Sequence, residues 1–393
     1  MSDRKVDEII KAVQAISPLP AEVTRLNELL EDSSTTVDEI AEVISQSPTF
    51  SSQTLKITNS SFYGLRGKVT SVSRAVIVLG AAHLRNLAMG FSAFASIENT
   101  QSKAADELSL LERHQLWQHS LSTALIAREL SLRLRIGDPD LVFTSALLHD
   151  FGKLIFMVHF PKEYQQVLEQ HQREQVPLHE LETACFGIDH AQLGRMICDK
   201  WQFPRELADA VSNHHNMAPG QKSFIDLISS ADAISLIAGT GFGGSNLISV
   251  HCFENLLRSG CPVSLLLELI DTTRRSMVAI DDKFFLPEEA AIISPEDWSD
   301  RISIDVRDDA VRVITTLVIS VLGLQVLSEG ERVVVLDQEP PASNGDQTRY
   351  IDISSTKIST RQDDSGWKDS LINLPGLQQM ISEVFITPAG VLS

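Results

Sequence analysis

Apolar residues recur every three or four positions through most of the first 280 residues, which is the spacing of an amphipathic helix. The first such stripe consists of Val6, Ile9, Ile10, Val13 and Ile16. The alternation of apolar and polar residues that is typical of a strand is almost absent from this part of the sequence. The pattern therefore predicts an all-α fold.

Helix boundaries in the N-terminal part can be identified from capping residues. Thr36 and Glu39 have the spacing of a capping box, and Ser47 followed by Pro48 has the form of an N-cap and a first helical residue. The expected helices are short and closely linked. We therefore expect residues 1–110 to form an N-terminal helical bundle.

A longer helix is expected over residues 106–135. The next helix, which starts at Asp138, is expected to carry both His149 and Asp150. Further helices are expected to begin near residues 161, 178, 189, 204 and 223. Residues 111–280 should thus form a second helical domain, and the architecture is a two-part helical bundle.

A C-terminal extension follows the two domains. Residues 281–336 are expected to be helical, with one amphipathic helix over residues 307–323. After this the composition becomes polar and rich in Pro, Gly and Ser, so residues 337–393 are expected to form a linker and tail. A short helix over residues 371–385 is expected within this tail.

The charge balance limits the choice of partners. Lys and Arg total 33 against 52 Asp and Glu, which gives a formal net charge of -19. Such a chain repels nucleic acid and anionic membranes over most of its surface, so neither partner is expected. The longest apolar stretch, Val313–Leu324, is shorter than the roughly 20 residues that span a bilayer. With four cysteines, no C-x-x-C motif and no apolar leader, the sequence predicts a soluble, cytoplasmic protein.

Seven residues with metal-binding side chains lie on the expected helices of the second domain. They are His119, His149, Asp150, His190, His214, His215 and Asp232. Neutral imidazoles and carboxylates bind divalent transition metals, and antiparallel helices can bring them to one bundle centre. Lys153, one turn after His149, would lie beside such a site and could hold the oxygen of a phosphate. We therefore expect a site for iron, manganese, zinc or nickel.

A structural interpretation of the same residues stays open. A single histidine is more often a core or surface residue than a ligand, and a buried His–Asp pair can link helices by hydrogen bonds. Only the set of seven favours a metal site, and the sequence does not show that the set converges. The remaining histidines are expected to be structural or surface residues: His83, His114, His159, His171, His179 and His251.

Other kinds of chemistry find little support. The stretch GTGFGGSN, residues 239–246, has the glycine content of a phosphate-binding loop. It follows a helix instead of a strand and lacks the G-K-[ST] ending, so we expect a helix-terminating loop. The sequence contains no G-x-S-x-G motif, and no cysteine lies in a recognisable catalytic context.

Several segments, in order along the chain, resemble the HDOD family, the HD-related output domain of bacterial signalling proteins. Among them are DEIAEVISQSPTFSSQTLKITNSSFYG, VTSVSRAVIVLGAAHLRNLAM, ALLHDFGKL, FGIDHAQLGRMICDKWQFP and VSNHH. The resemblance runs from about Ser17 to Ala238 and does not cover residues 281–393. It implies an all-α fold related to the HD phosphohydrolases and the HD-GYP phosphodiesterases. HDOD proteins are usually treated as regulatory modules without demonstrated catalysis. The sequence shows no receiver, GGDEF or EAL segment, so the resemblance implies a stand-alone module.

The resemblance also implies roles for individual residues. The HD pattern of a His, a His-Asp pair and a distant Asp is matched in order by His119, His149, Asp150 and Asp232. The HD-GYP pattern adds a His and a His-His pair, matched by His190, His214 and His215, and it retains Lys153. After that pair the chain reads NMAPGQ, without the acidic residue and the Gly-Tyr-Pro run. This departure argues against hydrolysis of cyclic dinucleotides.

Two functions follow as alternatives. The first is a non-catalytic signalling module that acts through protein or ligand binding, with signalling proteins as partners and the oligomeric state left open. Its expected partner surface is residues 59–71, where Phe62 and Tyr63 are embedded among polar residues, although these aromatic side chains could also belong to the core. The second is a metal-dependent phosphohydrolase acting on a nucleotide or phosphoester, in which Lys153 steadies the phosphate.

Overall fold

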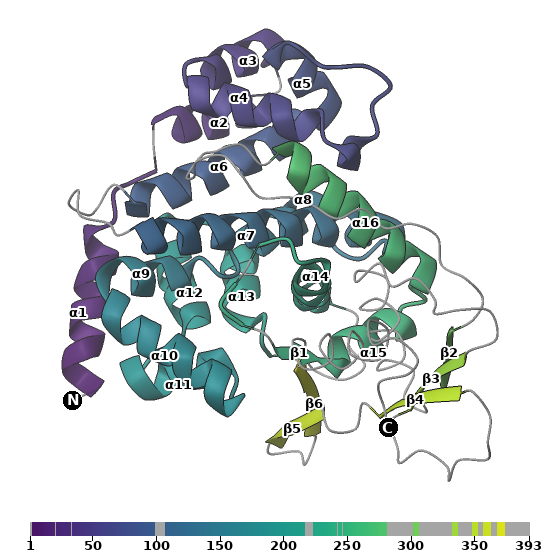
Figure 1. Ribbon diagram of the computed structural model, residues 1–393. Coiled ribbons are helices and arrows are strands. Elements are labelled where there is room, and N and C mark those ends of the chain that lie inside the picture. The colour runs from purple at the N-terminus through teal and green to yellow at the C-terminus, as the bar shows by residue number, and fades with distance from the viewer. Residues whose placement is uncertain are drawn as a thin grey trace.

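The computed structural model describes most of residues 2–280 and five strands beyond them (Figure 1). The described residues are 2–19, 21–32, 34–98, 107–216, 223–241, 243–245 and 247–280, together with strands β2 to β6, whose bounds are given below. Helices dominate this part of the chain, which confirms the predicted all-α class.

The N-terminal part consists of short helices joined by tight connections. These are α1 (Ser2–Ala15), α2 (Ala21–Glu31), α3 (Val37–Ser45), α4 (Pro48–Thr58), the 3₁₀ turn η1 (Ser61–Tyr63), α5 (Val72–Leu79) and α6 (Ala81–Glu98). The predicted caps are confirmed. Thr36 and Glu39 form a reciprocal capping box on α3, and the Ser47 side chain accepts a hydrogen bond from the Phe50 amide at the start of α4.

The second part is built around one long helix. Its elements are α7 (Glu107–Leu134), α8 (Pro139–Leu148), α9 (Gly152–His159), α10 (Pro161–Glu174), α11 (Leu178–Phe186), α12 (His190–Lys200), α13 (Arg205–Asn213), α14 (Phe224–Ala238), α15 (Val250–Arg258) and α16 (Val263–Ile280). Helix α7 crosses the middle of the molecule and packs against α8, α14 and α16 (Figure 1). Helices α8 and α14 also contact each other, so residues of these three helices can meet at one centre.

The two parts of the bundle share one hydrophobic core. Helix α1 packs against α9, α11 and α12, where the Trp201 indole N–H donates to the Ser17 carbonyl oxygen at 3.1 Å. Helix α16 returns to the N-terminal part and packs on α4 and η1. Packing of this kind crosses the predicted domain boundary at residue 110, which falls in the first turn of α7.

The sequence predicted one helix that carries both His149 and Asp150. In the structure this prediction is wrong, because both residues lie at the junction of α8 and α9. Here the amides of Phe151 and Lys153 donate to the carbonyls three residues back, which is the tighter 3₁₀ pattern. The stretch Pro139–His159 is long and apolar enough to cross a membrane, but 94% of its most apolar window is buried in the protein. It is a core segment of this fold.

Strands in the C-terminal extension form two small sheets. The first has the order β1 (Leu247–Ser249), β6 (Lys368–Asn373), β5 (Lys357–Gln362), with antiparallel pairs. The second has the order β2 (Ile302–Asp305), β3 (Arg332–Leu336), β4 (Thr348–Asp352), with parallel pairs.

The strands correct part of the expected extension. The prediction of a linker over residues 337–393 is wrong where β4, β5 and β6 lie, because β-branched residues within polar stretches support short strands. The same holds at β2 and β3, within the region expected to be helical. The helix expected over 307–323 lies outside the described residues. That expected over 371–385 begins in β6, and the rest of it lies outside them.

Candidate metal centre

Four of the predicted ligands form a first group between three helical elements. His119 lies in α7, His149 and Asp150 at the α8–α9 junction, and Asp232 in α14. Nε2 of His119 is 2.9 Å from Oδ1 of Asp232 and 3.6 Å from Oδ2 of Asp150. Nε2 of His149 is 3.3 Å from the same Oδ2. Asp226, on the same helix as Asp232, is not part of this group, because its carboxylate accepts hydrogen bonds from the Ser223 amide and hydroxyl at the start of α14.

The remaining three histidines form a second group on the other oxygen of Asp150. Nε2 of His190 is 3.2 Å from Oδ1 of Asp150, and Nε2 of His214 is 3.8 Å from it. Nε2 of His215 lies 2.8 Å from Nε2 of His190. Asp150 thus presents one carboxylate oxygen to each group, and the structure brings all seven predicted ligands together.

Two glycines allow the second group to reach Asp150. A Cβ on Gly152 would collide with the carbonyl oxygen of His190 and lie 3.0 Å from the amide of Gly194. A Cβ on Gly194 would itself lie 2.8 Å from Cγ1 of Val211 on α13. Helices α9, α12 and α13 therefore approach closely only because these positions lack side chains.

The histidines are oriented so that their Nε2 atoms point inward. Nδ1–H of His149 donates to the Ala146 carbonyl at 2.7 Å, and Nδ1–H of His214 donates to the Val211 carbonyl at 2.7 Å. Such bonds fix the tautomer that leaves Nε2 with its lone pair. Among the described residues, Nε2 of the fully buried His149 makes no aligned hydrogen bond, although Oδ2 of Asp150 lies 3.3 Å away. A buried lone pair without a donor fits a site built for a cation.

Glu182 orients His190 and is a residue that the sequence analysis missed. Its side chain is fully buried, and Oε2 accepts from both Nδ1–H and the backbone amide of His190, at 2.5 and 2.8 Å. Oε1 accepts from the Tyr164 hydroxyl at 3.0 Å. A carboxylate behind a ligating histidine is the usual second partner in metal sites. No pattern in the sequence links Glu182 to the histidine eight positions later.

Burial and neighbouring charges set the protonation states of the cluster. Burial alone would raise the pKa of Asp150, but His149 and Lys153 outweigh it and hold this pKa well below its usual value. Burial, with the charges of His149 and His190, holds the pKa of His214 well below its usual value. Burial would lower the pKa of His190, but Glu182 outweighs it and raises the pKa to about 9. At neutral pH, Asp150 is therefore ionised and His214 is neutral, the forms that bind cations. At His149 and His190 the neighbouring carboxylates outweigh burial and raise the pKa, so each of these two rings must release a proton to bind a cation.

The loop after α14 closes one side of the cluster. Gly239 ends α14 in the left-handed conformation, as expected. Beyond it, a Cβ on Gly243 would lie 2.8 Å from Nε2 of His119 and 2.9 Å from Oδ2 of Asp150. The Gly243 carbonyl accepts from Nζ of Lys153 at 2.6 Å, and the same Nζ donates to Oδ2 of Asp150 at 2.7 Å. The loop therefore contacts the first group directly, a role that the sequence did not reveal.

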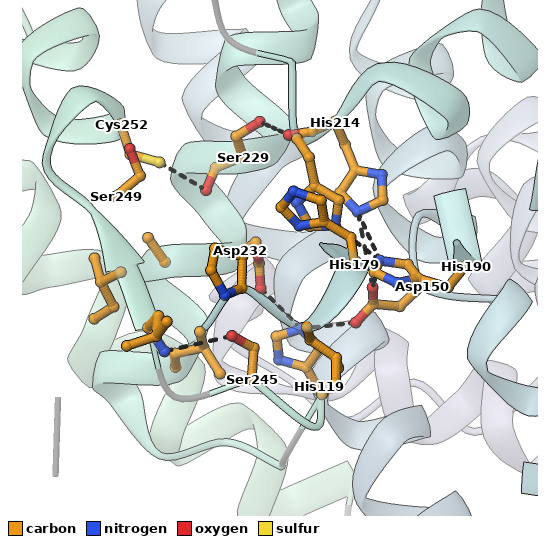
Figure 2. Close-up of a pocket in the computed structure, with 18 of the residues that line it drawn as sticks. His119, Asp150, His179, His190, His214, Ser229, Asp232, Ser245, Ser249 and Cys252 are labelled. Carbon is orange, nitrogen blue, oxygen red and sulfur yellow. Dashed lines mark hydrogen bonds and ion pairs between the residues drawn. The ribbon is translucent and has the colours of Figure 1, made fainter. Parts of the chain in front are cut away.

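A pocket of about 100 Å³ opens onto the cluster (Figure 2). His119, Asp150, His190, His214, His215, Asp232 and Lys153 line it. Asp232, whose side chain is 26% exposed, is the part of the first group most open to the pocket. His179, expected to be structural or on the surface, also lines the pocket, and its ring stacks on that of His215 at 4.4 Å. The cluster is accessible to a ligand.

Phe62 and Tyr63, the expected partner-binding residues, are far from fully exposed. Both are half-buried and pack against the core. The Tyr63 hydroxyl is 2.6 Å from Nε2 of His83, and Nδ1 of His83 is 3.5 Å from Asp140. Leu65, at 39% exposure, is the more accessible apolar side chain of this stretch. That these residues bind a partner stays a prediction.

Comparison with known proteins identifies the family of this chain. A protein of Treponema pallidum named only as uncharacterized is 26% identical over 224 residues, which are 56% of this chain and 42% of the relative, so the chain spans less than half of that protein's length. Solved structures with a similar fold include an HDOD domain protein of unknown function from Geobacter sulfurreducens, with 21% identity and a TM-score of 0.50 over 71% of this chain and 93% of its own.

A proposed phosphohydrolase from Shewanella amazonensis has 18% identity and a TM-score of 0.52 over 70% of this chain and 98% of its own. At these identities the structural likeness establishes the fold alone. The family model of the HDOD domain matches residues 16–217. Because this match covers more than half of the sequence, the chain belongs to the HDOD family.

Proposed function

We propose that this chain is an HDOD signalling module whose HD-like half binds one or two divalent transition-metal ions. The observation that carries the proposal is the convergence of His119, His149, His190 and His214 on the two oxygens of Asp150, each through its Nε2. A helix-linking network would pair these nitrogens with donors or acceptors. Here Nε2 of His149 lies 3.3 Å from Oδ2 of Asp150 but makes no aligned hydrogen bond with it or with any other described residue.

The donor set indicates which ions fit. Imidazole nitrogens outnumber carboxylate oxygens, a composition that favours iron, manganese, zinc or nickel over magnesium or calcium. The first group offers His119, His149, Asp150 and Asp232, and the second offers His190, His214 and His215. One oxygen of Asp150 faces each group, so Asp150 would serve as a ligand in both.

Metal content tests the proposal. Wild-type protein without a histidine tag should contain stoichiometric transition metal by inductively coupled plasma mass spectrometry, and a His149→Ala/Asp150→Ala variant should contain none. A His83→Ala/Asp140→Ala variant is the matched control, because this is also a His–Asp pair with a buried histidine, 3.5 Å apart, but lies outside the cluster. Metal-free wild type after reconstitution would refute the proposal.

Phosphoester hydrolysis is a second proposal, supported by the pocket that reaches both groups. A bound ion would lower the pKa of its water toward neutrality and so supply a nucleophile. Lys153 lies at the pocket with its ammonium 2.7 Å from Asp150, where it can steady a phosphate oxygen. Metal-loaded protein should hydrolyse generic phosphoesters. A screen that finds no turnover, in protein shown to hold metal, would leave only the binding function.

The signalling role requires a partner, and we propose residues 59–71 as its surface. Substitution of the exposed Leu65 by Asp should abolish the interaction without disturbing Tyr63, which is held by His83. Ile77 on α5, at 59% exposure, offers the matched control Ile77→Asp. Pull-downs in which the Leu65 variant retains every wild-type partner would count against this surface.

A further inference from the structure

We infer that the pocket accepts a small phosphomonoester, a phosphate with an organic group of a few carbon atoms, and excludes nucleotides and cyclic dinucleotides. The inference rests on the proposed metal site and names its ligand. The pocket has a volume of about 100 Å³. Sites for drug-sized ligands, a class that includes nucleotides, enclose about 300–1,000 Å³.

The pocket has two chemically distinct ends. His190, His214 and Asp150 lie at one end, and Ser249 and Cys252 lie at the other (Figure 2). Ser229 lies beside Cys252, whose thiol donates to the Ser229 carbonyl, and the lining also includes the apolar side chains of Leu236 on α14 and of Leu247 and Ile248 on β1. Such an arrangement fits an anionic head at the cluster and a short tail with methylene and hydroxyl groups.

The aromatic rings among the described lining residues already contact one another. Bases are commonly bound by stacking on Phe, Tyr, Trp, His or an Arg guanidinium. Histidines are the only residues of these types among the described residues that line the pocket. The His179 ring stacks on His215, and the His215 ring also contacts His190 and His214, which leaves little ring surface for a base.

Charge makes anion binding conditional on the metal. Among the described lining residues, the carboxylates of Asp150, Asp232 and Glu180 outnumber the charged groups of Lys153 and His190, and both of these already contact Asp150. Without cations this lining repels a phosphate dianion. Cations at the cluster reverse the sign of the field. Phosphate binding should therefore require metal.

The apolar wall that β1 provides is held by the C-terminal extension. Strand β1 contributes Leu247 and Ile248 to the lining and is paired with β6, with Leu247 opposite Asn373 and Ile248 opposite Ile372. The backbone of β1 is therefore fixed by hydrogen bonds on this edge. A rigid wall keeps the tail of the ligand short.

Isothermal titration calorimetry on the full chain tests the inference. The metal content of each sample is measured first, and the probes are inorganic phosphate, glycerol 3-phosphate, adenosine 5′-monophosphate and cyclic di-GMP. Metal-loaded wild type should bind the first two at least tenfold more tightly than the last two, and protein without metal should bind none. A Leu247→Ala variant should gain at least tenfold in affinity for adenosine 5′-monophosphate and keep its affinity for inorganic phosphate. Leu29→Ala, an equally buried leucine on α2, should change neither affinity.

The outcomes separate the two proposals. Wild type that never binds metal overturns the proposed function and this inference with it. Metal-loaded protein that binds no phosphate, or that binds adenosine 5′-monophosphate as tightly as glycerol 3-phosphate, overturns the inference alone. A Leu247→Ala variant that binds the four probes as wild type does also overturns it, because the wall then does not limit the ligand.

Discussion

Substitution of Gly243 by alanine should damage the proposed metal site without replacing any proposed ligand. The added Cβ would lie 2.7 Å from Cδ2 of His119, 2.8 Å from its Nε2 and 2.9 Å from Oδ2 of Asp150. Ordinary contacts begin at 3.4 Å, so the Asp150 oxygen would have to move by about 0.5 Å. Metal sites tolerate changes in ligand distance of only about 0.2 Å. The ligands cannot accommodate the methyl group and hold an ion as before.

The magnitude follows from two effects. Overpacking a buried site costs about 1–3 kcal/mol of folding stability. Disturbing the partners that orient metal ligands lowers metal affinity by about 10–100-fold. We therefore expect Gly243→Ala to fold, to unfold at lower urea concentration than wild type, and to bind metal 10–100-fold more weakly.

Competition with a chromophoric chelator measures this loss, and urea unfolding measures stability. Gly239→Ala is the matched control on the same loop, because its φ of +68° strains the backbone while nothing lies within 4 Å of the added Cβ. It should lose stability by about 1–2 kcal/mol and keep its metal affinity. Wild-type metal affinity in Gly243→Ala would refute the reasoning, since the loop would then not contact the ligands as described.

Other predictions test the supporting structure. Glu182→Gln should weaken metal binding by about 10–100-fold, seen by chelator competition, because His190 loses its charged partner. Gly152→Ala should lower the free energy of unfolding by about 1–3 kcal/mol in urea, because its Cβ collides with the His190 backbone. Burial lowers the pKa of His83 in the folded chain. As the pH falls below about 6.5, the unfolded chain binds a proton at His83 more readily than the folded chain does, so stability falls. In urea titrations at several pH values, His83→Gln should lose part of this pH dependence. Metal at about 100 times its Kd should add about 2.7 kcal/mol of stability, and excess chelator should remove it, seen as a change in Tm.

Local signals in the sequence were enough for most of the helices. A capping box such as that at Thr36, or the glycine that ends α14, acts within one turn and needs no tertiary contact. The order of the candidate ligands was also visible, because His149 and Asp150 are adjacent and the other histidines lie on recognisable helices or directly after one, as His214 and His215 do after α13. The sequence could not show that these helices face one another.

What the sequence missed depends on contacts between distant segments. Glu182 and Gly243 have their roles because α11 and the loop after α14 fold back onto the cluster. The break between α8 and α9 replaces helical bonds by tighter ones, and Gly152, at the start of α9, is the only helix-breaking residue type at this point. Strand β6 pairs with β1, more than 100 residues earlier in the chain, so no local pattern links the two.

The cluster itself argues for a bound cation over a helix-linking network. A buried polar atom without an aligned hydrogen bond, such as Nε2 of His149, costs about 1–3 kcal/mol, and a buried ion pair such as Lys153 with Asp150 rarely stabilises a fold more than apolar residues would. Burial also lowers the pKa of His214, so its ring stays neutral at a pH at which an exposed histidine would be protonated. A core that gathers so many groups of this kind is less stable than an apolar one of the same volume. Binding of an ion only to the folded chain would offset that deficit, whereas hydrogen bonds among the groups leave it in place.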